Sequence, residues 1–290
     1  MADTLTSFFG DQIKRVVKAS KAATVITEDN VYQEGDPYIM SVIDEMVGAL
    51  MLPKSSLVGM EHLEELLAKA ESGKACLLLV EHYSNMDLSI LSLMARKAGG
   101  RGEDISNALV AIAGMKLNED NPVVAAFAGA YTKIVIYPSR SLQETDDKAE
   151  IARGAAINRA AMKSLIRHKY KGKLVLVFPS GTRYRAWDPD TKKGVREIDS
   201  YIRSFDYLCF VSLNGELLHV QQTDMMNDIV SKDIVRVTVS PVTNCNEFRD
   251  KVLATAVNEE DKKQAVADAI MNELEKMHIS AEAERLKLFE

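Results

Sequence analysis

The sequence predicts an α/β fold: a mostly parallel mixed sheet, covered by helices on both faces and preceded by an N-terminal helical subdomain. Three observations support this fold class. The first seventy residues have helical apolar spacing. From Lys74 onward, short apolar runs alternate with helical stretches, which implies crossover connections between parallel strands. The length of 290 residues suits an α/β domain with an added subdomain. We therefore expect a helical subdomain over residues 1–73 and the α/β domain over residues 74–290.

The helices of the first part are predicted from apolar spacing and from their end signals. Residues 6–23 form one candidate, and Asp36-Pro37 starts a second that runs to residue 52. Residues 61–71 are amphipathic, and Gly73 follows where a left-handed residue often ends a helix. The first 73 residues therefore read as a group of helices.

The elements of the second part are predicted from apolar runs and the helical stretches around them. The expected strands are residues 75–80, 108–112, 133–137, 173–178, 207–213 and 234–239. The expected helices are residues 88–98, 122–128 and 148–168, followed by two acidic helices near residues 247–257 and 259–277.

Polar residues follow several of the expected strands. His82 follows the first, Ser139-Arg140 follows the third, and the segment Ser180 to Arg185 follows the fourth. Ligands of open α/β sheets gather at the carboxyl ends of the strands. We therefore expect these residues, distant in sequence, to face one edge of the sheet.

The segment from Glu81 to Asp87 is the first candidate for chemistry. It delivers a histidine at the end of a strand and a carboxylate in the first turn of the next helix. Such a pair can act as a general base, with His82 taking a proton and Asp87 fixing its tautomer and stabilising its cation. The structural alternative is a capping box formed by Ser84-x-x-Asp87. Both roles can coexist, because a capping aspartate is held rigidly.

The segment from Phe178 to Arg185 is the second candidate. Pro, Ser and Gly are ordinary turn residues, but Arg183 and Arg185 next to exposed backbone N–H groups make a good phosphate cradle. Ser180 lacks the Gly-x-Ser-x-Gly elbow of a serine hydrolase.

Charge is concentrated around this second segment. Residues 171–196 hold seven basic residues and two acidic ones, which indicates a local anion site or, alternatively, a solvated loop. Lys133 is interpreted as surface charge, and Lys116 either as a solvated lysine or as a further side chain at the same edge.

Composition excludes several classes of protein. The net charge of −6 argues against nucleic acid as a partner, and no apolar stretch approaches a membrane span. No secretory signal is recognised, so we expect a soluble, cytoplasmic protein. Cys76, Cys209 and Cys245 suit the core of a protein in a reducing compartment. The five histidines lack metal-ligand spacing, so neither a metal nor another cofactor is predicted.

The two motifs together resemble those of a known family. His82-x4-Asp87, followed about a hundred positions later by Phe-Pro-Ser-Gly-Thr-Arg, looks like the glycerolipid acyltransferases with the His-x4-Asp signature. The resemblance covers residues 74–214. Ser180, the Arg183-x-Arg185 pair and the Asp-Pro-x-Thr segment from Asp188 are most similar to the soluble, plastid-type glycerol-3-phosphate acyltransferases. A departure lies near Arg140, where Ser141 stands in place of a histidine of that family.

The resemblance implies an activity and partners. The predicted reaction moves a fatty acyl group from acyl carrier protein or coenzyme A to the 1-hydroxyl of glycerol 3-phosphate, in a cytoplasmic or plastid-stroma-like compartment and at a transient membrane surface. His82 would be the base, Asp87 its partner, and Arg140, Arg183 and Arg185 would bind the phosphate. The N–H groups at Ser180, Gly181 and Thr182 would hold either the oxyanion or the phosphate.

Two alternatives stay open at this point. The acceptor can be lysophosphatidate, as in the second step of the same pathway. The chain can also be a non-catalytic module that binds phospholipid or a carrier protein, with His82 and Asp87 serving only to cap a helix.

Overall fold

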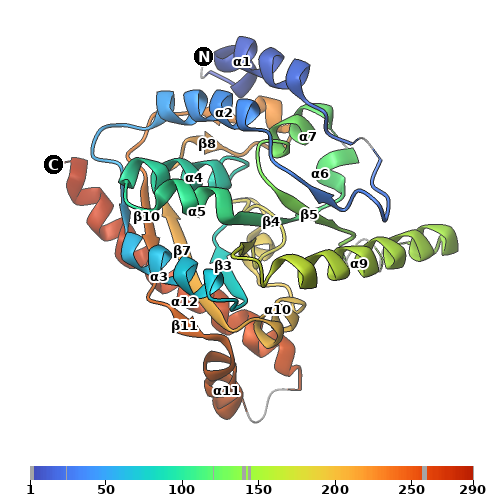
Figure 1. Cartoon of the computed structure of the whole chain (residues 1–290). Helices are drawn as coiled ribbons and strands as arrows, with labels where there is room; N and C mark the ends of the chain where they lie inside the picture. Colours follow the sequence, from blue (N-terminus) through green and yellow to red (C-terminus); the bar gives the residue numbers. More distant parts are fainter. Residues whose placement is uncertain are drawn as a thin grey trace.

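The computed structural model describes residues 3–23, 25–119, 121–138, 142, 145–256 and 260–289 of the chain. These residues form a nine-stranded mixed sheet with helices on both faces, together with a separate two-stranded sheet (Figure 1). The predicted α/β fold is therefore confirmed.

The bounds of the elements are as follows. The strands are β1 (Tyr32–Gln33), β2 (Ser56–Val58), β3 (Cys76–Val80), β4 (Leu109–Gly114), β5 (Lys133–Ile136), β6 (Leu174–Val177), β7 (Tyr207–Asn214), β8 (Leu218–His219), β9 (Ile229–Val230), β10 (Arg236–Val239) and β11 (Thr243–Asn244). The α-helices are α1 (Leu5–Ala19), α2 (Pro37–Leu50), α3 (Met60–Glu71), α4 (Asp87–Ala98), α5 (Gly102–Ala108), α6 (Lys116–Glu119), α7 (Pro122–Ala128), α9 (Lys148–His168), α10 (Ile198–Ser204), α11 (Cys245–Thr255) and α12 (Lys262–Leu286). The short 3₁₀ helices are η1 (Pro189–Lys192), η2 (Met225–Asn227) and η3 (Lys287–Phe289).

The centre of the sheet is parallel and its margins are mixed. The strand order is β1-β5-β4-β6-β3-β7-β10-β2, with β11 also pairing with β7. Strands β5, β4, β6, β3 and β7 run parallel to one another. β1 pairs antiparallel with β5, and β10 and β11 pair antiparallel with β7, whereas β2 is parallel to β10. Since β3 lies between β6 and β7, residues that follow β3 and β6 emerge side by side at the carboxyl edge.

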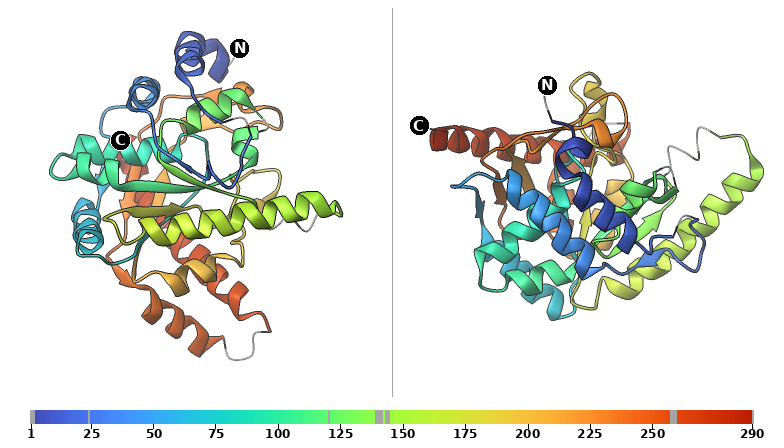
Figure 2. Two further views of the ribbon diagram at one scale, coloured as in Figure 1. Left: turned by 45° about the vertical axis from the view of Figure 1, so that its right-hand side comes forward. Right: turned by 90° about the horizontal axis from the view of Figure 1, so that it is seen from above.

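Each face of the sheet has its own apolar core, because successive side chains of a strand point to opposite faces. In β3, Leu78 and Val80 belong to the core under α1 to α5 and α7, and Leu77 and Leu79 belong to the core under α9, α10 and α12. Figures 1 and 2 show these two helical layers, with α9 extending well beyond the body of the sheet. Every residue of β3 is buried. A continuous apolar strand of this kind is typical of a parallel sheet covered on both sides.

The first 73 residues are not only helical. β1 extends one edge of the sheet by pairing with β5, and β2 extends the other by pairing with β10. Helices α1, α2 and α3 contribute to the same core as α4 and β7. This segment thus shares strands and core with the rest of the fold.

The elements expected from periodicity are present, and their ends differ by a few residues. All six predicted strands occur, with β6 and β10 starting one and two residues later than expected. α1 ends at Ala19 instead of residue 23, and α12 continues to Leu286 instead of residue 277. Gly73 has the expected positive φ of 87° directly after α3. The short elements α5, α10, β1 and β2 escaped prediction because their apolar patterns are too brief.

Lys133 is buried, so its interpretation as surface charge was wrong. The residue is 3% exposed at the start of β5, and its Nζ donates to the Ala128 carbonyl, 2.9 Å away, at the end of α7. Burial lowers the pKa of the Lys133 ammonium from 10.5 to about 8. A helix C-terminus favours a cation, which offsets part of the cost of burying this one.

The buried ammonium predicts a pH-dependent stability. Between pH 8 and 10.5 the unfolded chain holds a proton on Lys133 that the folded chain has lost, so the free energy of unfolding should rise with pH. The rise should be about 3 kcal/mol across this window. Urea unfolding measures the free energy of unfolding of the wild type and of Lys133→Met at each pH. The difference between the two proteins should change by this amount across the window. Lys276→Met, at a 72% exposed side chain, is the matched control. If the difference in the free energy of unfolding between the wild type and Lys133→Met did not change with pH, the lowered pKa of Lys133 would be contradicted.

Candidate active site

Strands β3 and β6 bring the two sequence motifs into contact. The ladder pairs Leu79 of β3 with Val177 of β6, so the residues that follow both strands meet at the carboxyl edge. The rings of His82 and Phe178 stack with centroids 3.9 Å apart and an interplanar angle of 14°. The N–H of Tyr184 donates to the His82 carbonyl at 2.8 Å. The predicted meeting of the two segments is thus observed, and it fixes one face of the histidine ring.

His82 and Asp87 form a close imidazole–carboxylate pair. His82 Nδ1 lies 2.9 Å from Asp87 Oδ2, with the Asp87 side chain only 3% exposed. An ionised carboxylate only accepts hydrogen bonds, so Nδ1 carries the proton and Nε2 keeps the lone pair. The His82 side chain retains 17% exposure. The pair therefore presents a histidine nitrogen that can accept a proton at the carboxyl edge of the sheet.

The Asp87 carboxylate is held by the turn that precedes it. It accepts from the Tyr83 N–H at 2.6 Å, from the Ser84 N–H at 2.9 and 3.1 Å, and from the Ser84 hydroxyl at 2.8 Å. The expected capping box is not formed, because Met86 and not Ser84 directly precedes α4 and no side-chain cap hydrogen bond is made. Ser84 instead donates to Asp87, the first residue of α4, and its hydroxyl accepts from the Met86 N–H at 3.1 Å. The same hydrogen bonds that organise the helix start also aim the carboxylate at His82.

The second motif folds as a tight turn beside the histidine. The Gly181 N–H donates to the Phe178 carbonyl at 2.9 Å, and Gly181 has φ of 65°, a conformation that favours glycine. The Ser180 hydroxyl donates to the Thr182 carbonyl at 2.7 Å. The Val195 N–H donates to the Pro179 carbonyl at 2.9 Å and closes the loop. Ser180 thus has a structural partner for its hydroxyl.

Arg183 has a buried carboxylate partner that the sequence did not reveal. Its Nη1 donates to Asp228 Oδ2 at 3.1 Å, with Asp228 1% exposed. Burial raises the pKa of the Asp228 carboxyl, and the Gln221 N–H and Arg183 act in the opposite direction. Arg185 is half-buried, and its backbone N–H donates to the Thr191 hydroxyl at 2.9 Å. Asp228 therefore sets the direction of one of the two arginines of the motif.

Two residues named in the sequence analysis, Arg140 and Ser141, fall outside the described residues. The basic segment is divided between the two edges of the sheet. Lys173 donates to the Asn107 carbonyl at the amino edge, 3.0 Å away, whereas Arg183 and Arg185 lie at the carboxyl edge. The concentration of charge in the sequence thus does not form one patch.

Glu81 and His278 are site neighbours that sequence reasoning missed. The Glu81 side chain is 4% exposed and lies 2.9 Å, through Oε2, from His278 Nδ1 on α12. Burial lowers the pKa of His278, but the hydrogen bond and charge of Glu81 outweigh it, and the pKa ends above its ordinary value. A glutamate at the end of an otherwise apolar strand was the signal in the sequence. Its partner His278 lies 197 positions away, and nothing in the sequence indicated that the two would pair.

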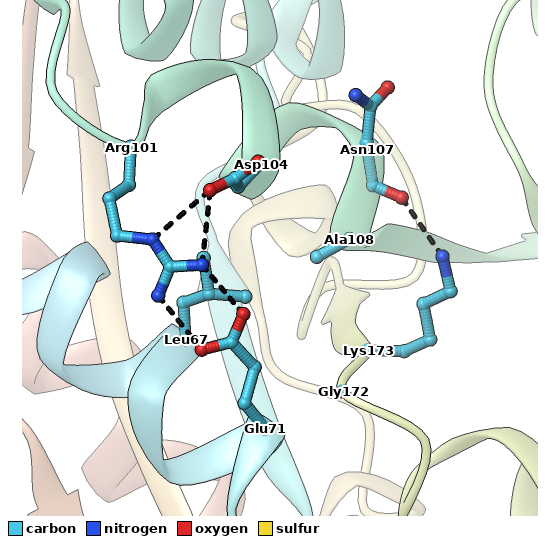
Figure 3. Close-up of a pocket in the computed structure, with 8 residues that line it drawn as sticks. All are labelled: Leu67, Glu71, Arg101, Asp104, Asn107, Ala108, Gly172 and Lys173. Carbon is cyan, nitrogen blue, oxygen red and sulfur yellow. Dashed lines mark hydrogen bonds and ion pairs between the residues drawn. The ribbon is translucent and has the colours of Figure 1, made fainter.

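Two hollows are relevant to binding. A small one of about 20 Å³ lies among Glu81, His82, Ser180 and Thr191, which is room for roughly one water molecule. A larger one of about 250 Å³ lies beside the amino ends of β4 and β6, where Ala108 and Lys173 line it (Figure 3). There Arg101 is bound by Glu71 and Asp104, so its charge is already balanced. The smaller hollow is therefore the one that adjoins the His82–Asp87 pair, and the His82 side chain is 17% exposed beside it.

The described residues contain no group of three or more His, Cys, Asp or Glu side chains placed to hold a metal ion. None of their helices is long and apolar enough to cross a membrane.

Comparison with known proteins adds a family match. The sequence model of the family described as Acyltransferase matches residues 56–239, from β2 to the end of β10. The match includes both motifs and Asp228 and ends before α11 and α12. A search of curated proteins gives no match.

The buried carboxylate network predicts the effect of Asp87→Asn. The amide keeps the shape but replaces one acceptor oxygen by a donor. With the amide nitrogen in place of Oδ2, the Tyr83 N–H and His82 Nδ1 lose their acceptor, and with it in place of Oδ1, the Ser84 hydroxyl loses its acceptor. The free energy of unfolding should fall by about 1–3 kcal/mol. Urea denaturation measures the change, with Asp250→Asn at an exposed position of α11 as control. Equal stability of the two variants would show that the Asp87 carboxylate is not needed to hold the turn.

Proposed function

The chain belongs to the Acyltransferase family, and from this premise we propose that it transfers a fatty acyl group to the 1-hydroxyl of glycerol 3-phosphate. The chain is thus an acyltransferase, and its acceptor and donor are the proposed part. The donor is a long-chain thioester of acyl carrier protein or coenzyme A, and the product is lysophosphatidate. The product carries a long acyl chain, so we place the reaction at a transient membrane surface.

One observation carries the proposal. His82 Nδ1 is bound 2.9 Å from a nearly fully buried Asp87, which leaves Nε2 as the basic atom. A rigid imidazole–carboxylate pair supports proton removal from a hydroxyl. Phe178 stacked on the ring supports a fixed direction for that nitrogen.

The reaction proceeds by direct attack in this proposal. His82 Nε2 takes the proton of the acceptor hydroxyl while its oxygen forms a bond to the thioester carbonyl carbon. The C–S bond of the tetrahedral intermediate then breaks, and the leaving sulfur receives the proton from His82. Asp87 stabilises the imidazolium that exists between these steps. An acyl-enzyme is not required, and the Ser180 hydroxyl is engaged with the Thr182 carbonyl.

Arginines of the second motif support binding of the acceptor phosphate. A guanidinium forms two parallel hydrogen bonds with a phosphate, which positions the hydroxyl as well as neutralising charge. Arg183 lies at the carboxyl edge with its direction set by Asp228, and Arg185 lies two residues further on the same loop. We assign both to the phosphate, with Arg140 as a third candidate.

Backbone donors near the turn are proposed for the thioester oxyanion. The Gly181 N–H is already bound to the Phe178 carbonyl. Within the described residues, no acceptor is found for the N–H groups of Ser180 and Thr182. These two donors are therefore our candidates for the oxyanion, or for phosphate oxygens.

Replacing the base tests the proposal directly. His82→Ala should lower kcat by about 10²–10⁴-fold, since general base catalysis contributes that much. Release of free thiol from an acyl thioester is measured with glycerol 3-phosphate and, separately, with lysophosphatidate. His219→Ala is the control, because His219 pairs with Glu216 outside the site. A folded His82→Ala variant that keeps most of its turnover would refute the base assignment. Thiol release with lysophosphatidate alone would reassign the acceptor, and ligand binding without thiol release would indicate a binding module.

Arg185 provides a separate test of phosphate recognition. Arg185→Gln should raise KM for glycerol 3-phosphate by about 10–100-fold, because a charge-assisted hydrogen bond is lost. KM for the acyl thioester should stay unchanged. Steady-state kinetics with each substrate varied in turn measures both values. Arg159→Gln, at an exposed position of α9, serves as control. An unchanged KM for the phosphorylated acceptor would remove Arg185 from the phosphate site.

A further inference from the structure

A second histidine–carboxylate pair lies next to the first, on the other side of Tyr83. We propose that His278 of α12 and Glu81 are positioning residues that act through Tyr83 to hold the His82–Asp87 pair in its reactive geometry. The inference rests on the proposed function of His82. It adds a requirement for α12, which lies beyond the part of the chain that the family match covers.

Glu81 has a dense set of donors for a residue at a strand end. Its Oε2 accepts from the Leu213 N–H of β7 at 2.9 Å and lies 2.9 Å from His278 Nδ1. Its Oε1 accepts from the Tyr83 hydroxyl at 3.2 Å. At 4% exposure, a carboxylate here requires such donors. His278 supplies one of them from α12.

His278 is anchored within α12. The Asn214 amide of β7 donates to its carbonyl at 3.0 Å and to Glu282 Oε2 at 3.1 Å. Glu275 and Lys192 also act on its charge, with Glu275 favouring the cation and Lys192 opposing it. Burial lowers the pKa of His278, but the hydrogen bond and charge of Glu81 together outweigh it, and the pKa is raised. His278 therefore holds Glu81 Oε2 through the contact at Nδ1.

Tyr83 connects the two pairs. Its hydroxyl donates to Glu81 and lies 3.4 Å from His278 Nδ1, whereas its backbone N–H donates to Asp87 Oδ2 at 2.6 Å. Asp87 Oδ2 is the same oxygen that faces His82 Nδ1. Movement of the Tyr83 side chain therefore moves a donor of the catalytic carboxylate. Through this residue, α12 determines the orientation of Asp87.

Loss of His278 removes a hydrogen-bond donor from Glu81. Glu81 Oε2 then keeps only the Leu213 N–H, so the buried carboxylate can rotate out of its present position. This rotation disturbs its hydrogen bond from the Tyr83 hydroxyl and hence the turn that binds Asp87. Small displacements at a catalytic group cost about 10²-fold in rate. The acceptor and thioester sites do not include His278, so their KM values should be preserved.

Four variants test the coupling. His278→Leu removes the donor, and His278→Asn restores a neutral donor near the position of Nδ1. Tyr83→Phe removes only the hydroxyl and retains the backbone N–H, and the double variant Tyr83→Phe/His278→Leu completes a thermodynamic cycle. His219→Leu is the matched control, because His219 forms an exposed pair with Glu216 at 2.9 Å.

The expected kinetic result is a selective loss of turnover. His278→Leu should lower kcat by about 10–100-fold with KM for both substrates unchanged, and His278→Asn should recover most of the loss. In the Tyr83→Phe background, His278→Leu should have little further effect. Three results would overturn the proposal. They are losses of kcat that add up in the double variant, a His278→Asn kcat as low as that of His278→Leu, and a kcat that His278→Leu leaves unchanged.

A spectroscopic readout separates this inference from the proposed function. The hydrogen bond from His82 Nδ1 to Asp87 should give a downfield imidazole proton resonance in the resting protein. It should persist in His278→Asn and His219→Leu and be lost or broadened in His278→Leu and Tyr83→Phe. A wild type that shows the resonance but transfers no acyl group would refute the function alone. An unchanged resonance in folded His278→Leu and Tyr83→Phe would refute the coupling alone.

Discussion

The parallel pairing of β3 with β6 is the constraint on which the site depends. β3 is buried on both faces, and its hydrogen bonds to β6 and β7 leave no freedom in register. The register decides that the residue stacking on His82 is Phe178, almost a hundred positions away. A shift of one residue in this ladder would turn every side chain of the strand to the opposite face. The chemistry of the carboxyl edge is therefore specified by apolar residues that never meet a substrate.

The same kind of pair occurs three times at the carboxyl edge of the sheet. Three basic side chains there each contact a carboxylate whose side chain is less than 5% exposed. The pairs are His82 with Asp87, Arg183 with Asp228, and His278 with Glu81. A buried carboxylate without a partner is costly, so each pair holds its geometry firmly. In this acidic protein, buried negative charge thus fixes the direction of a small number of basic side chains.

Local features of the fold and site were predictable, and non-local ones were not. The β3 strand, the turn at Gly181 and the His82–Asp87 pair all depend on residues within a few positions of one another, so spacing was informative. The partners of Arg183 and Glu81 lie 45 and 197 residues away, and only the folded chain brings them close. Lys133 was misjudged for a related reason. A lysine in sequence is normally exposed, and only the end of α7 makes its burial tolerable.

The position of β7 has a consequence for biosynthesis. The local pair of His82 and Asp87 is complete once the first third of the chain has been made, yet β7 and α12 are still missing. Until β7 is available, β3 lacks one of its two neighbours and Glu81 lacks the Leu213 N–H. β2 likewise waits for β10, at positions 236–239. Contacts of such sequence separation close slowly because the loop between them must be ordered first. A nascent chain therefore contains His82 and Asp87 long before β7 and α12, which supply the hydrogen-bond partners of Glu81, have been made.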